Sequence, residues 1–197
     1  IQTHREGMSE GFIRGVFTRL LNGLREVHSH KLLHLDLKPS NILLDQQDQP
    51  HVTDFGLAKR LTGQESLTRS GAIVGTPSYM APEQVRIEAV DGRADIFALG
   101  AVLHEMLAGH RPFTGDSTLA TLDAVLTEQP PDLSALNPDI PPPLSRIVRR
   151  CLAKTPGDRF ATVNELVSSL DSVVQARHPP PPPTLRAVFR RRAVMVT

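Results

Sequence analysis

Four polar side chains with complementary chemistry lie in two short segments of the sequence. Asp36, Lys38 and Asn41 are near neighbours, and Asp54 follows them at the start of an Asp-Phe-Gly triplet. A carboxylate can accept a proton, a lysine ammonium can stabilise developing negative charge, and carboxylate and amide oxygens suit a hard divalent cation. A single loop aspartate is usually only a turn residue, so the hypothesis of a reactive site depends on all four.

The order of three motifs gives these residues a context. Residues 34–41 read His-Leu-Asp-Leu-Lys-Pro-Ser-Asn, and the triplets Asp-Phe-Gly at 54–56 and Ala-Pro-Glu at 81–83 follow. They resemble the catalytic loop, metal-binding triplet and activation-segment end of a eukaryotic-type (Hanks-type) serine/threonine protein kinase catalytic domain. The resemblance covers residues 9–175 and implies the C-terminal lobe of that fold, mainly α (α+β), with a short β-hairpin at the catalytic loop.

The resemblance also implies a role for each site residue. Asp36 is expected to orient the acceptor hydroxyl and take its proton, while Lys38 places a positive charge against the γ-phosphate. Asn41 and Asp54 are expected to bind Mg²⁺, so the implied cofactors are ATP and Mg²⁺, with Lys38, Asn41 and Asp54 contacting them. Thr76 matches a threonine that bonds to the catalytic Asp and Lys in this family, and is the third catalytic candidate after Asp36 and Lys38.

Two segments indicate which hydroxyl is the acceptor. Residues 38–41 (Lys-Pro-Ser-Asn) resemble the serine/threonine version of the catalytic loop, and residues 75–83 resemble the matching substrate-docking segment. The implied partners are proteins with Ser or Thr acceptors rather than Tyr.

Further residues are predicted to support this site. Glu83 and Arg159 resemble the family's buried ion pair between the activation-segment end and the loop before the last helix. Asp95 matches the carboxylate that holds the catalytic-loop backbone, although without the resemblance it would be only a first-turn acid favoured by the helix dipole. Cys151 lies on an apolar helix face, so we expect a small core residue there.

The sequence departs from the kinase pattern in two places. Before Ser9 there is no glycine-rich loop, no strand lysine and no helix for its glutamate partner, so the N-terminal lobe is expected to be absent. A fragment that is inactive alone is the simplest explanation. Leu35 occupies the position of the arginine that usually pairs with a phosphorylated activation-loop residue, so control by that phosphate is expected to be lost.

Composition and charge limit the other possibilities. With 40% hydrophobic and 22% charged residues, the composition is that of a globular protein. The formal net charge of +1 gives no general nucleic-acid footprint, so no nucleic-acid partner is expected. A single cysteine cannot form an intrachain disulfide, which favours a reducing, cytoplasmic location.

Apolar spacing predicts the elements that must position the site. Helices are expected at 9–30, 91–109, 117–127, 143–152 and 162–174, with 91–109 buried on several sides and Thr162 and Glu165 forming a capping box. A hairpin is expected from 42–44 and 51–53, followed by a long loop to Ser78.

A composition change marks a predicted domain boundary, with the kinase domain at 1–176 and a Pro-rich basic tail or linker at 177–197. The tail holds five consecutive prolines and five arginines without an acid. It could bring the chain close to a membrane, as in the cytoplasmic part of a membrane-anchored kinase.

The leading hypothesis is a serine/threonine protein kinase, and the alternative is a non-catalytic kinase-like lobe that acts as a protein-binding module.

Overall fold

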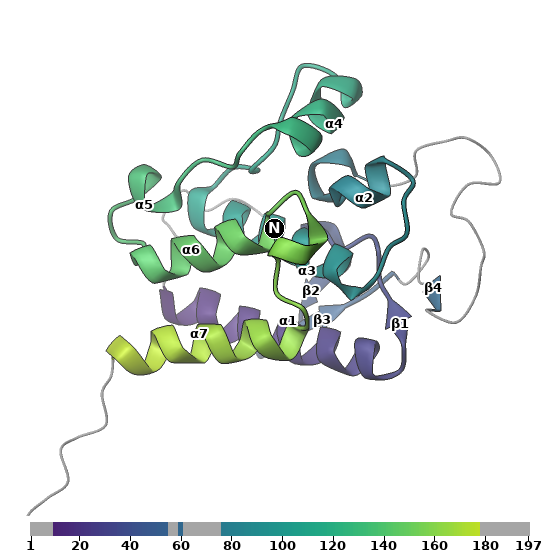
Figure 1. Ribbon diagram of the computed structural model, residues 1–197. Coiled ribbons are helices and arrows are strands. Elements are labelled where there is room, and N and C mark those ends of the chain that lie inside the picture. The colour runs from purple at the N-terminus through teal and green to yellow at the C-terminus, as the bar shows by residue number, and fades with distance from the viewer. Residues whose placement is uncertain (1–9, 55–58, 61–75, 178–197) are drawn as a thin grey trace, which may run out of the picture.

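The computed structural model describes residues 10–54, 59–60 and 76–177 and is mainly helical (Figure 1). The short strands form two separate antiparallel pairs, β1 with β4 and β2 with β3. In chain order the described elements are α1 (Glu10–Ser29), β1 (Leu32–Leu33), η1 (Pro39–Asn41), β2 (Ile42–Leu44), β3 (Pro50–Val52), β4 (Lys59–Arg60), η2 (Pro77–Tyr79), α2 (Pro82–Val85), α3 (Gly92–Ala108), α4 (Thr118–Thr127), α5 (Leu133–Leu136), α6 (Pro142–Cys151), η3 (Pro156–Asp158) and α7 (Val163–Arg177).

Helix α3 lies at the centre of the fold, as predicted from the apolar residues that the sequence places on several of its sides. Every residue from Ala94 to His104 is buried, because α1, α5 and α6 pack around it. The helix begins where the Asp91 side chain accepts a hydrogen bond from the Arg93 N–H. It ends at Gly109, whose left-handed φ of 77° is suited to a residue without a Cβ.

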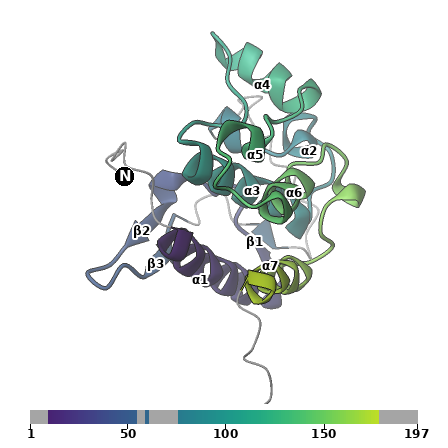
Figure 2. The ribbon, with the colours of Figure 1, turned by 90° about the vertical axis from the view of Figure 1, so that its left-hand side faces the viewer.

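Two long helices cover one side of α3. Helices α1 and α7 lie side by side along that edge, and α4 lies at the opposite end of the molecule (Figures 1 and 2). Helix α1 presents residues four apart, Val16, Leu20 and Leu24, to the core. The expected cap at Ser9 lies outside the described residues. Among residues 10–54, 59–60 and 76–177, no helix has the length and apolar character needed to cross a membrane.

Helices α3 and α6 meet at an unusually close point. A Cβ added at Gly100 would lie 2.5 Å from the Cβ of Cys151, so only glycine allows the two backbones to approach this far. Cys151 is buried, as predicted, and burial raises the pKa of its thiol to about 12. The thiol therefore stays protonated and acts as a packing group.

The predicted hairpin forms, with Ile42 opposite Val52 and Leu44 opposite Pro50, one residue earlier on its second strand than expected. The prediction of a continuous loop from there to Ser78 was wrong at Lys59 and Arg60. These two residues form β4 and pair with β1. A two-residue strand leaves no alternation to detect, which is why its pairing was missed. The rest of that segment, 55–58 and 61–75, lies outside the described residues.

The capping box predicted at the start of α7 is only half correct. The Thr162 hydroxyl accepts from the Glu165 N–H at 3.2 Å, but the Glu165 carboxylate accepts from the Ala161 N–H at 2.8 Å instead of from Thr162. The same carboxylate binds Arg150 at 2.7 Å, which draws it toward α6. The one-turn helices α2 and α5 were not predicted, because four residues carry no usable periodicity.

Replacement of Gly100 by alanine is expected to destabilise the fold by about 1–3 kcal/mol, because the new methyl group forces α3 and α6 apart. The matched control is Gly23→Ala on the exposed side of α1, where a Cβ meets nothing within 4 Å and alanine should stabilise by about 0.5–1 kcal/mol. Urea unfolding of both variants measures the difference. Equal effects in the two variants would contradict the close approach at Gly100.

Candidate active site

The carboxylate of Asp36 is held by two of its predicted neighbours. The Lys38 ammonium lies 2.7 Å from Asp36 Oδ2, and Asn41 Nδ2 donates to the same oxygen at 3.2 Å and to the Asp36 carbonyl at 2.9 Å. Both side chains of the ion pair are largely buried, with exposed fractions of 21% for Lys38 and 14% for Asp36. Oδ1 of Asp36 makes no hydrogen bond within the described part of the chain, which leaves this atom able to accept a proton.

The hairpin places Asp54 beside this cluster. The Thr53 N–H donates to the Asn41 carbonyl at 2.9 Å, so the strand pairing continues one residue past β3 and Asp54 follows directly. Asp54 has a left-handed φ of 61°, a conformation that aspartate tolerates better than most residues. The Asn41 amide nitrogen donates to Asp36, and its Oδ1 accepts only a long hydrogen bond from the Ser40 hydroxyl, at 3.4 Å, among the described residues. An amide oxygen and a carboxylate are the donor set that suits Mg²⁺.

A buried aspartate in α3 holds the backbone of the loop at residues 34 and 35. Asp95, in the first turn of α3, is fully buried and accepts from the Leu35 N–H at 2.7 Å and from the His34 N–H at 2.9 Å. The role predicted for Asp95 therefore has a direct structural basis. His34 adds a second support, since its Nδ1 accepts from the Asp36 N–H at 3.3 Å and its Nε2 donates to the Thr53 carbonyl at 3.1 Å. These bonds join the two halves of the site.

Leu35, the departure from the family pattern, points into the core. Its side chain is 4% exposed and belongs to the main apolar cluster. Its φ of 64° is in the left-handed region, which is strained for a bulky residue. A side chain buried in this way cannot contact a phosphate.

The segment around Thr76 is fixed by its backbone and by Tyr79. The Thr76 side chain makes no hydrogen bond to Asp36 or Lys38 in the described structure, and its carbonyl accepts from the Tyr79 N–H at 3.1 Å. The Tyr79 hydroxyl donates to Glu105 Oε2, and burial together with that carboxylate raises the pKa of Tyr79 well above its usual value. The contact expected for Thr76 therefore remains a prediction.

Comparison with known proteins identifies the family. Residues 1–170 match the family model described as the protein kinase domain. The chain belongs to the protein kinase domain family.

Named relatives of this kinase domain come from several bacteria. The chain is 39% identical over 160 residues to the serine/threonine-protein kinase PknB of Mycolicibacterium smegmatis, covering 80% of this chain and 25% of that protein. It is 46% identical over 131 residues to the DNA damage-responsive serine/threonine-protein kinase RqkA of Deinococcus radiodurans, covering 66% and 20%. It is 36% identical over 181 residues to the serine/threonine-protein kinase PknA of Corynebacterium glutamicum, covering 91% and 38%. The chain thus spans well under half the length of these relatives.

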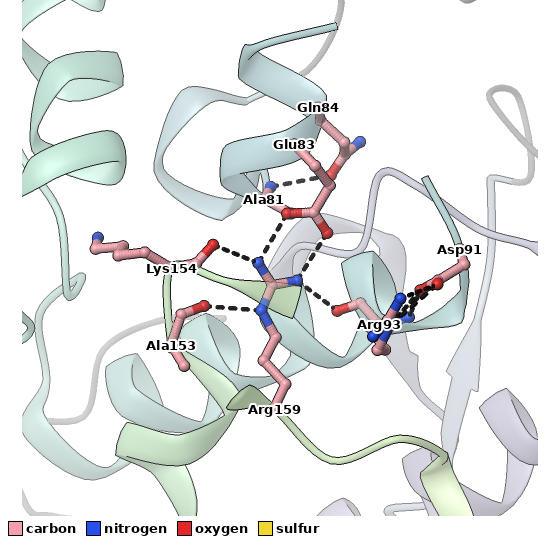
Figure 3. A network of polar contacts seen from close by, with 8 residues as sticks. All are labelled: Ala81, Glu83, Gln84, Asp91, Arg93, Ala153, Lys154 and Arg159. Atoms are coloured by element: carbon pink, nitrogen blue, oxygen red, sulfur yellow. Dashed lines mark hydrogen bonds and ion pairs between the residues drawn. The ribbon is translucent and has the colours of Figure 1, made fainter. Parts of the chain in front are cut away.

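The predicted ion pair of the kinase domain is present and fully buried. The Arg159 guanidinium binds the two oxygens of Glu83 at 2.7 Å each, and both residues are 2% exposed (Figure 3). Its remaining donors reach the carbonyls of Arg93 at 2.9 Å, Ala153 at 2.8 Å and Lys154 at 3.2 Å. All five guanidinium N–H groups are therefore satisfied, which is the condition for keeping such a charge buried.

Sequence reasoning missed two residues that contact the site. His28, in the last turn of α1, lies with Nε2 2.8 Å from Asp95 Oδ2. Gln84, in α2, donates from Nε2 to the Leu35 carbonyl at 2.9 Å. A single histidine and a single glutamine carry no sequence signal of their own. Only their closeness to the kinase motifs, at 34–41 for His28 and at 81–83 for Gln84, could have drawn attention to them.

Arg159→Ala is expected to lower the free energy of unfolding by about 3–5 kcal/mol, because Glu83 would remain buried without its partner. Arg146 lies exposed on α6 and provides the matched control, since Arg146→Ala should change stability by less than about 0.5 kcal/mol. Thermal and urea unfolding of both variants measure the difference. Equal, small losses would show that the ion pair does not stabilise the domain.

Proposed function

We propose that this chain is the large lobe of a serine/threonine protein kinase, which transfers the γ-phosphoryl group of MgATP to Ser or Thr hydroxyls of proteins. The observation that carries the proposal is the convergence of Lys38 and Asn41 on one oxygen of Asp36, with the other oxygen left as an acceptor. Membership of the protein kinase domain family supports it.

Each side chain has a defined task in this reaction. Asp36 Oδ1 accepts a hydrogen bond from the acceptor hydroxyl, orients its oxygen toward the phosphorus atom and takes the proton as the new bond forms. The Lys38 ammonium stabilises negative charge that develops on the transferred group. In the structure the same ammonium neutralises Asp36, which keeps both charges within a partly buried loop. The proposed catalytic contribution is therefore mainly positioning and electrostatics.

The oxygen atoms of Asn41 and Asp54 are proposed to hold Mg²⁺ together with the phosphates of ATP. Among the described residues no group of three or more His, Cys, Asp or Glu side chains could hold a metal alone. When bound, the cation neutralises charge on the phosphate oxygens. The orientation of Asn41 depends on its bonds to Asp36, so the two proposed tasks are mechanically linked.

The proposal extends to the wider protein. The remaining part of the nucleotide cleft is assigned to a separate N-terminal lobe, and residues 177–197 to a linker with a basic end. A cytoplasmic location is proposed from the single cysteine, which is buried. The alternative, a kinase-like lobe that only binds proteins, is disfavoured because Asp36, Lys38, Asn41 and Asp54 are all retained.

Asp36→Asn should reduce phosphate transfer by about 10²- to 10⁴-fold, because the amide cannot accept the hydroxyl proton while it keeps the size of the side chain. The matched control is Asp48→Asn in the exposed β2–β3 turn, where φ is 56° and asparagine is well tolerated. Radiolabelled ATP and peptides that differ only in Ser, Thr or Tyr at the acceptor measure the rate and the acceptor preference. In the protein that carries this chain, turnover unaffected by Asp36→Asn would favour the binding-module alternative.

Simultaneous alanine substitution of Ser66, Thr68 and Ser70 should leave most of the kinase activity. A phosphate on any of these residues has no arginine to pair with at position 35, which is a leucine in this chain. Thr76→Ala should instead lower kcat by about tenfold, through loss of a hydrogen bond that forms in the active complex. Both variants are compared by kcat in the protein that carries this chain.

A collapse of the triple variant that acidic substitutions restore would contradict this prediction. It would mean that another basic residue binds the phosphate, with Arg60 and Arg69 nearest in sequence.

A further inference from the structure

The strained backbone at Leu35 is the starting point. A bulky residue with φ of 64° persists only where its surroundings hold it in place. Leu35 directly precedes Asp36 and its carbonyl shares a peptide group with the Asp36 N–H, so the conformation of Leu35 also sets the position of the catalytic carboxylate. Whatever holds both ends of Leu35 therefore controls the geometry of the site.

Two side chains hold Leu35 from opposite ends. Asp95 accepts from its N–H at 2.7 Å, and Gln84 Nε2 donates to its C=O at 2.9 Å. Asp95 belongs to the core helix α3, whereas Gln84 lies in α2, immediately after Glu83 of the motif that ends the activation segment. The carbonyl of Leu35 is thus tied to a different part of the molecule from its N–H.

The other end of the Gln84 amide is also used. Its Oε1 accepts from the Ala81 N–H at 3.0 Å (Figure 3), so a reversed amide would oppose like groups at both ends. One side chain therefore joins the end of the activation segment at Ala81 to the catalytic loop at Leu35. It does so with a neutral amide.

We propose that Gln84 is a positioning residue for phosphoryl transfer, which couples the order of the activation-segment end to the backbone beside Asp36 without any phosphate. The inference rests on the proposed kinase function. The Leu35 side chain is apolar and buried, so it cannot link these two segments through a charge. The neutral Gln84 amide links them directly through hydrogen bonds. A kinase built in this way is ordered by folding rather than by modification.

The competing explanation is that Gln84 merely caps the short helix α2 through Ala81. Gln84→Glu separates the two roles, because a carboxylate still accepts from the Ala81 N–H but no longer donates to the Leu35 carbonyl. Gln84→Leu removes both bonds at similar size. Gln46→Glu is the matched control, since it makes the same change of charge at an exposed side chain that forms no hydrogen bond among the described residues.

The experiment measures amide hydrogen exchange and steady-state kinetics in the protein that carries this chain, after thermal melts have confirmed that each variant folds. In Gln84→Glu, exchange at the Asp36 amide, which shares a peptide group with the Leu35 carbonyl, should rise about fivefold while Ala81 stays protected, and in Gln84→Leu both should rise. The kcat of Gln84→Glu should fall about fivefold, with the KM values for ATP and peptide changed less than about twofold. Gln46→Glu should match the wild type in every measurement.

Wild-type kcat and wild-type exchange at the Asp36 amide in Gln84→Glu would overturn the proposal and leave Gln84 as a helix cap. Faster exchange at the Asp36 amide with an unchanged kcat would also overturn it, since the link would then have no effect on transfer. A wild-type protein without any turnover would refute the proposed kinase function and with it the catalytic role of Gln84. The exchange measurement distinguishes these cases because it reports the link independently of activity.

Discussion

The buried carboxylate of Asp95 is the interaction on which the rest of the site depends. It has no exposed surface and accepts hydrogen bonds from two successive backbone amides, those of His34 and Leu35, while His28 contacts it from α1. A buried carboxylate is tolerated only when such donors compensate its lost hydration. Because α3 is buried along most of its length, this arrangement fixes the catalytic loop to the central helix of the core.

A second buried charge organises the other side of α3. Arg159 joins Glu83 of the activation-segment end to the first turn of α3 through the Arg93 carbonyl, and its guanidinium lies 5.0 Å from the centre of the Phe97 ring. Asp95 and Arg159 thus hold the two functional segments against the same helix. Gln84 then bridges the two segments directly. The family's motifs serve as anchor points as well as reactive groups.

Much of this arrangement could be predicted from local sequence. The five main helices and the hairpin were recognised because their apolar residues recur at regular intervals, and the site residues because they occur in short ordered motifs. The strand β4, the one-turn helices and the changed partner of Glu165 were not, since these features are too short for periodicity or depend on a competing neighbour such as Arg150. The burial of Leu35 likewise required a view of the packed core.

The sequence by itself determined the family, the mainly helical fold and the chemical identities of the candidate site residues, because these depend on residue types and on their spacing within short segments. Only the tertiary structure decided which atoms meet. The His28 and Asp95 pair is separated by 67 positions and the Gln84 and Leu35 pair by 49, so no local pattern links them. Their partnership follows from how α1, α2 and α3 pack around the catalytic loop, and a buried polar group takes whichever partner that packing brings within reach.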